Sequence, residues 1–174
     1  MSDQEKLDKR DIALLIGKAV MQWNEVHSYF FLAFYDCAGM DLGMAKAIYY
    51  STPSDKAQRA LALTAVTELA GKGSTHAREF GRICRSADAL AAKRNAAVHQ
   101  LWTHEEGERF VVVPDDRLHL HAAFSDGHVD VLRSLDREIG RIYIDILEWN
   151  KSSFDELTER FNVRRLPQTP EAAR

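Results

Sequence analysis

Cysteine is scarce in this chain, since only Cys37 and Cys84 occur among its 174 residues. Each lies inside a helical apolar pattern, so the sequence favours buried thiols in a reducing compartment over a disulfide framework. Long apolar runs are also lacking, and none reaches the length of a membrane span. The polar residues 1–6 lack the apolar region of a signal peptide. We therefore expect a cytoplasmic protein that makes no membrane contact.

The familiar motifs of nucleotide and metal chemistry are absent as well. The chain has no glycine-rich phosphate loop, no GxSxG elbow and no HExxH pair. His119 and His121 would share one face of a strand, but zinc sites usually need three or four ligands at ordered spacing. Exposed histidines are the preferred interpretation, and we expect no metal and no cofactor.

What is present is the composition of an ordinary soluble domain, with 45% hydrophobic and 28% charged residues. A length of 174 residues fits one domain with a sizeable core. The net charge of -3 argues against a protein that coats nucleic acid indiscriminately, because such binding depends on many phosphate contacts. A local basic patch is still compatible with this charge.

Apolar residues recur at helical spacing from the start of the chain. A capping box, Ser2–Glu5, opens a long first helix that is predicted to stop at Gly39. A short helix capped by Asp41 follows and ends near Tyr50. In the first helix, additional apolar residues widen the stripe beyond one face: Phe31, Leu32 and Tyr35. A helix of this kind has two internal neighbours or a partner subunit, so we expect a homodimer.

Two further helices follow in the middle of the chain. The first starts with Pro53 at its first helical position and ends at Gly71. The second starts at Ser74 or Thr75 and continues to about Trp102.

After Trp102 the hydrophobic period changes. The runs 109–113 and 117–121 flank a turn signal at 114–116, which predicts a small hairpin over about 108–121. A long last helix follows, with apolar positions Leu132, Leu135, Ile139, Ile142, Ile146 and Trp149. We predict an all-α fold in a single domain, 1–163, with a flexible C-terminal tail, 164–174. Its architecture is an antiparallel four-helix bundle with a short extra helix and a small β-hairpin before the last helix.

The segment Arg94–His99 is the strongest chemical signal. Arginine supplies a permanent cation for a phosphate, and histidine is suited to moving protons near neutral pH. Arg94 falls near the middle of the apolar face of its helix, whereas Asn95 and His99 stack four residues apart on the flank. An arginine aimed at a core needs a partner, for which Glu25 is the first candidate. Weaker candidates are Asp36 and Asp145, and a cleft at this point is the alternative.

Two interpretations of this segment stay open. In the structural one, Arg94 forms an ion pair, Asn95 ties down a neighbouring backbone and His99 is a satisfied interface residue. In the chemical one, His99 exchanges a proton with a ribose 2′-hydroxyl or with the leaving oxygen during phosphodiester cleavage. Arg94 then stabilises charge on phosphorus, and Asn95 orients His99 or the phosphate.

Basic residues on one broad side of the same helix are candidates for guiding RNA toward His99. They are Arg78, Arg82, Arg85 and Lys93. Glu79 and Asp88 interrupt this set, which favours a solvated surface as the alternative.

The spacing of Arg94, Asn95, His99 and Trp102 resembles the RNxxxHxxW run of small bacterial HEPN-like proteins (higher eukaryotes and prokaryotes nucleotide-binding), which carry the Rx4-6H motif. The long first helix with Trp23 and Glu25 and the hairpin before the last helix are also similar to that group. The resemblance implies a helical bundle that dimerises around a shared cleft. By this resemblance, Arg94, Asn95 and His99 are the catalytic positions.

The resemblance implies a metal-independent endoribonuclease of the toxin, defence or RNA-processing type, leaving 2′,3′-cyclic phosphate ends. Lys93, Arg85 and Arg82 would then bind substrate, and Trp23, Glu25 and Trp102 would support the site. Some HEPN domains lack catalysis, so the alternative is an inactive interaction or scaffold module. Family analogy also implies an antitoxin-like protein partner.

Overall fold

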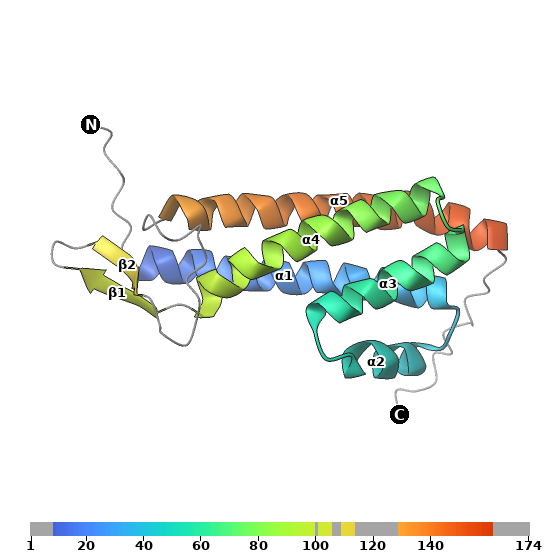
Figure 1. Cartoon of the computed structure of the whole chain (residues 1–174), viewed down its shortest axis with the longest axis horizontal. Helices are drawn as coiled ribbons and strands as arrows, with labels where there is room; N and C mark the ends of the chain where they lie inside the picture. The colour runs from blue at the N-terminus through green and yellow to red at the C-terminus, as the bar shows by residue number, and fades with distance from the viewer. Residues whose placement is uncertain (1–8, 100, 106–108, 114–128, 162–174) are drawn as a thin grey trace, which may run out of the picture. The chain divides into compact units, whose positions relative to one another are not determined.

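The computed structural model describes residues 9–99, 101–105, 109–113 and 129–161. This part of the chain is mainly helical, as the sequence predicted, and its helices pack against one another (Figure 1). In chain order the elements are α1 (Lys9–Ala38), α2 (Leu42–Ser51), α3 (Asp55–Ala70), α4 (Thr75–His99), β1 (Leu101–Glu105), β2 (Arg109–Val113) and α5 (Val129–Phe161). No helix within these ranges has both the length and the apolar character needed to cross a membrane.

Most helix ends follow the local signals in the sequence. The Asp41 side chain caps α2 by accepting a hydrogen bond from the Met44 amide at 2.9 Å. Gly39 and Gly71 follow α1 and α3 with φ angles of 64° and 89°, which glycine adopts without strain. The prediction for Pro53 is wrong, because α3 begins at Asp55 and Ser54 is its extended N-cap residue.

The end of α4 differs from the prediction. The helix stops at His99 instead of Trp102, and Leu101–Glu105 forms β1. β1 pairs antiparallel with β2, so that Trp102 lies opposite Val112. The sequence pattern predicts that 109–113 pairs with 117–121, but 109–113 pairs with 101–105 instead, and 117–121 lies outside the described residues. Trp102 and Thr103 favour extended backbone, and pairing with β2 gives the backbone groups of β1 hydrogen-bond partners.

The chain divides into two compact units, which are described separately. Unit 1 comprises residues 1–26 and 86–143, and unit 2 comprises residues 27–85 and 144–174. The single domain over 1–163 stays a prediction. Three other predictions concern residues outside the described ranges: the capping box at Ser2–Glu5, the pair His119 and His121, and the tail at 164–174.

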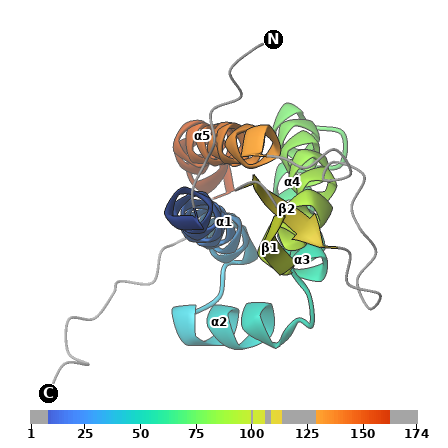
Figure 2. The same cartoon turned by 90° about the vertical axis from the view of Figure 1, so that its left-hand side faces the viewer.

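In unit 1 the first part of α1, the last part of α4 and the first part of α5 pack together (Figure 2). Contacts between all three pairs of helices are present. Lys18 on α1 binds Asp136 on α5, Lys93 on α4 binds Glu138 on α5, and Arg94 on α4 contacts Trp23 on α1. The buried side chains include Ile12, Ala19, Trp23, Val26, Leu90, Leu132, Leu135, Ile139 and Ile142. The predicted apolar stripes of the first and last helices therefore form the core of this unit.

Aromatic side chains dominate the core of unit 2. Phe30 on α1 meets Phe80 on α4 edge to face, with ring centroids 5.6 Å apart. Phe80 also contacts Trp149 on α5 at 4.5 Å. The ring of Tyr49 brings α2 onto α1 through Phe31 and Phe34. Contacts with α2 of the same chain thus explain part of the widened apolar stripe on the first helix, for example at Phe31.

Candidate functional site

The last two turns of α4, in unit 1, carry the candidate catalytic residues. Asn95 and His99 are exposed, and His99 is the last residue of the helix. They are four residues apart, so their side chains lie only about 40° apart around the helix axis. The structure therefore presents an amide and an imidazole together on one exposed side of α4.

Arg94 lies on a different side of the same helix. Its guanidinium carbon is 5.1 Å from the centre of the Trp23 ring, and Trp23 is only 1% exposed. An arginine over an indole face makes a favourable cation–π contact. Arg94 itself is half-buried. Five residues separate Arg94 from His99, which places their side chains about 140° apart around the axis.

Glu25, the first predicted partner of Arg94, is exposed on α1. It follows Trp23 by two residues, so the two side chains point about 200° apart around that helix. With Trp23 facing the core, Glu25 faces away from α4. The Arg94 guanidinium meets the indole of Trp23, on the face that the sequence pattern marked as apolar.

Lys93, predicted to bind substrate, is engaged within unit 1. Its ammonium lies 2.7 Å from Glu138 Oε1 and 3.2 Å from Ser134 Oγ, and Ser134 also donates to Glu138. Burial raises the pKa of Glu138, but hydrogen bonds from Lys93 and Ser134 and the charges of Lys93 and Arg141 outweigh this effect, so the pKa is lowered. Glu138 is therefore a carboxylate at neutral pH. This cluster joins α4 to α5 one residue before Arg94.

The other predicted substrate-binding residues lie in unit 2. Arg82 pairs with Asp145 at 2.8 Å, with both side chains partly exposed. Asp145 was a weaker candidate partner for Arg94, and its described contact is with Arg82. Arg85 is exposed. Arg78 donates to the Gly73 carbonyl at 2.6 Å, which fastens it to the turn before α4.

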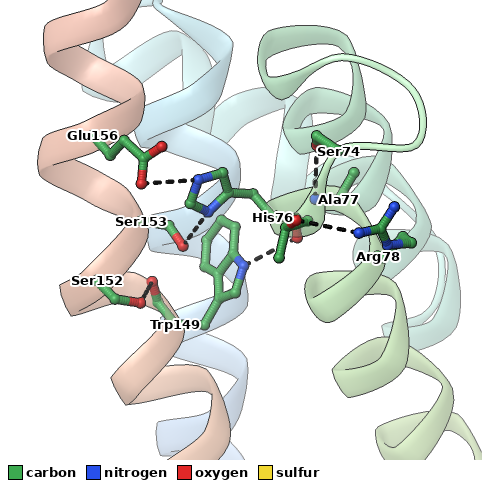
Figure 3. Close-up of polar contacts among 9 residues, drawn as sticks. Ser74, His76, Ala77, Arg78, Trp149, Ser152, Ser153 and Glu156 are labelled. Atoms are coloured by element: carbon green, nitrogen blue, oxygen red, sulfur yellow. Dashed lines mark hydrogen bonds and ion pairs between the residues drawn. The ribbon is translucent and has the colours of Figure 1, made fainter.

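A second polar cluster, in unit 2, was not anticipated from the sequence. The His76 ring lies between two α5 side chains, with Nδ1 3.0 Å from Ser153 Oγ and Nε2 3.2 Å from Glu156 (Figure 3). The Trp149 indole N–H donates to the His76 carbonyl at 3.1 Å. A serine, a histidine and a carboxylate also form hydrolase triads. Here, however, Ser153 is 0% exposed inside a helix, so a substrate cannot reach its hydroxyl, and the cluster fastens α4 to α5.

Neither cysteine offers a reactive thiol. Burial and the neighbouring Asp36 carboxylate raise the pKa of Cys37 to about 12. Cys84 is buried and donates weakly to the Arg59 carbonyl. Across the described ranges, no three histidine, cysteine, aspartate or glutamate side chains are placed to hold a metal ion.

Comparisons with protein-family models, with curated proteins and with solved structures find no match to this chain. The resemblance at Arg94–Trp102 therefore carries the functional argument together with the geometry described above.

Proposed function

We propose that this chain is a HEPN-like domain, built as an antiparallel four-helix bundle, that acts as a metal-independent endoribonuclease. The observation that carries the proposal is the exposed pair of Asn95 and His99 on the last two turns of α4. These two residues occur at the spacing of the family motif, and in unit 1 they face solvent, where an RNA strand has access to them.

The chemistry follows from the residue types. His99 takes the proton from a ribose 2′-hydroxyl as that oxygen attacks the adjacent phosphorus, or returns a proton to the departing 5′-oxygen. The 2′-oxygen–phosphorus bond forms and the phosphorus–5′-oxygen bond breaks, which leaves a 2′,3′-cyclic phosphate and a 5′-hydroxyl. Asn95 orients His99 or a phosphate oxygen. Arg94 stabilises the charge on the phosphorus when its guanidinium reaches that position.

The proposed assembly is a homodimer in which two such helix ends face a shared cleft. Its support is the family resemblance and exposed apolar side chains on α1, Leu14 and Met21, which lie seven residues apart on one side of that helix in unit 1. RNA is the proposed substrate, an antitoxin-like protein is the proposed partner, and the cytoplasm is the proposed location.

The test is cleavage of single-stranded RNA by the purified protein in the presence of EDTA. We expect His99→Ala to abolish cleavage and Asn95→Ala to reduce it by about two to three orders of magnitude, as removal of one stabilising hydrogen-bond donor does in other enzymes. Ser86→Ala is the matched control, because Ser86 is also exposed on α4 in unit 1. All three variants should keep the helical circular dichroism of the parent. Cleavage by His99→Ala at the parent rate would remove the nuclease proposal.

A second candidate function is a non-catalytic interaction module. It is favoured by the engagement of both cations of the motif, since Arg94 stacks on Trp23 and Lys93 binds Glu138. In this case Arg94 and Lys93 fix α4 within unit 1, and neither the parent nor any variant cleaves RNA. The same assay therefore separates the two candidates.

A further inference from the structure

The contact between Arg94 and Trp23 turns the guanidinium away from the exposed side of α4. The guanidinium carbon lies 5.1 Å from the ring centre, against an indole that is almost completely buried. Cation–π attraction strengthens where water is excluded, as it is on this face of Trp23. In the structure described, Arg94 therefore has a stable position that differs from the one the proposed chemistry requires.

A phosphate bound to His99 would lie on the exposed side of α4. From there, Arg94 is about 140° away around the helix axis. Lys93 is not a substitute, because its ammonium is 2.7 Å from the Glu138 carboxylate and also contacts Ser134. A cation reaches the phosphate if Arg94 leaves the indole and its long side chain swings around the helix. Such a change involves side-chain torsions alone and leaves the backbone of α4 in place.

We propose that the Trp23–Arg94 contact is autoinhibitory: it holds Arg94 away from the substrate phosphate, and RNA binding draws the guanidinium off the ring. This inference depends on the proposed function, since it needs an RNA phosphate at His99. Trp23 thus restrains Arg94 in the resting protein, whereas the family resemblance implies that Trp23 only supports the site. A ligand that binds only the released state must overcome the resting contact, so weakening that contact raises the apparent affinity for RNA.

The test measures affinity for an RNA that cannot be cleaved, so that His99 is kept. The parent protein is compared with Trp23→Phe, using a single-stranded 2′-O-methyl RNA oligomer of mixed sequence at low, fixed salt. Phenylalanine keeps an aromatic ring at position 23 but attracts a cation more weakly than tryptophan does. We expect the Kd to fall by up to about tenfold. In an Arg94→Met background the same change at position 23 should have no effect, which completes a double-mutant cycle.

A second variant controls for altered packing in Trp23→Phe, because Trp23 is a core residue and phenylalanine is smaller than tryptophan. Replacing Trp23 with 5-fluorotryptophan weakens the cation–π attraction with almost no change in shape, and it should lower the Kd in the same direction. An unchanged or higher Kd in a folded Trp23 variant overturns the autoinhibition, while RNA cleavage by the parent protein still supports the proposed function. Failure of every variant to bind RNA overturns both proposals.

Discussion

Replacing Tyr49 with phenylalanine should stabilise the protein. Tyr49 is 0% exposed, and its hydroxyl has no hydrogen-bond partner among the residues that the structure describes. Burial raises the pKa of Tyr49 far above its ordinary value, so the hydroxyl stays protonated and uncharged at neutral pH. A buried hydroxyl without a partner lowers stability by about 1–3 kcal/mol relative to an apolar group of the same shape.

The substitution Tyr49→Phe removes this hydroxyl and keeps the ring. The aromatic contacts of Tyr49 with Phe31 at 5.3 Å, Phe34 at 5.5 Å and Tyr50 at 5.3 Å are therefore retained. We expect a gain of about 1 kcal/mol in the free energy of unfolding, the lower end of the range because the denatured chain also changes. In a chain of this size, such a gain raises the Tm by about 2–4 °C.

Urea denaturation followed by circular dichroism measures this difference. Tyr50→Phe is the matched control, because Tyr50 is the next residue on α2 and is 58% exposed. Its free energy of unfolding should change by less than about 0.5 kcal/mol. If Tyr49→Phe lost about 1 kcal/mol or more, the hydroxyl would have a stabilising hydrogen bond, for example to an ordered water, and the argument from its burial would be refuted.

Two further stability predictions concern unit 1. Glu138→Gln should lower the free energy of unfolding near pH 7 by up to about 1 kcal/mol, because the ion pair with Lys93 is partly exposed. The pKa of Glu138 is lowered in the folded state, so the stability it contributes is present above the unfolded pKa of about 4.3 and is lost as the pH falls through the folded pKa. The difference between parent and variant in urea titrations should therefore shrink on acidification, and a difference that grew would contradict this linkage. Arg94→Met should lower the free energy of unfolding by about 0.5–2 kcal/mol through loss of the cation–π contact with Trp23, measured as a Tm shift by calorimetry. An unchanged Tm would show that this contact contributes no stability.

The parts of the fold that the sequence predicted well depend on local physics. Asp41 caps α2 because its carboxylate can reach an amide three residues ahead, and Gly71 ends α3 because its positive φ suits glycine. The stripe from Leu132 to Trp149 is buried at each predicted position, because helical periodicity fixes which side chains share a face. Such signals lie within one or two turns of the residue they concern.

The differences between the predicted and the observed structure concern choices that depend on distant partners. Whether α4 continues to Trp102 or stops at His99 depends on β2, which offers Leu101–Glu105 a strand to pair with. The partner of Lys93 lies 45 residues away on α5, and no spacing rule connects the two. The choice of Glu25 could have been improved from the sequence alone. A residue two positions from a buried tryptophan points to the other side of the helix.

The candidate site residues stay a prediction, but the structure shows how they lie on α4. The motif spacing correctly grouped Asn95 with His99, because residues four apart always stack on a helix. It could not show that Arg94 would rest on Trp23, since that depends on how α1 and α4 pack in unit 1. The cluster of His76, Ser153 and Glu156 had no local signal, because its members come from two helices far apart in sequence.

The distribution of buried tryptophans gives each unit its own optical reporter. Trp23 is enclosed in unit 1 against a guanidinium, and Trp149 is enclosed in unit 2 between a phenylalanine ring and a backbone carbonyl. Indole emission responds to its immediate surroundings, so in a variant in which the third tryptophan, Trp102, is replaced, Trp23 would report on unit 1 and Trp149 on unit 2. Spectra of variants that keep one indole would thus reveal whether the two halves of α1, α4 and α5 melt in a single cooperative step or in succession.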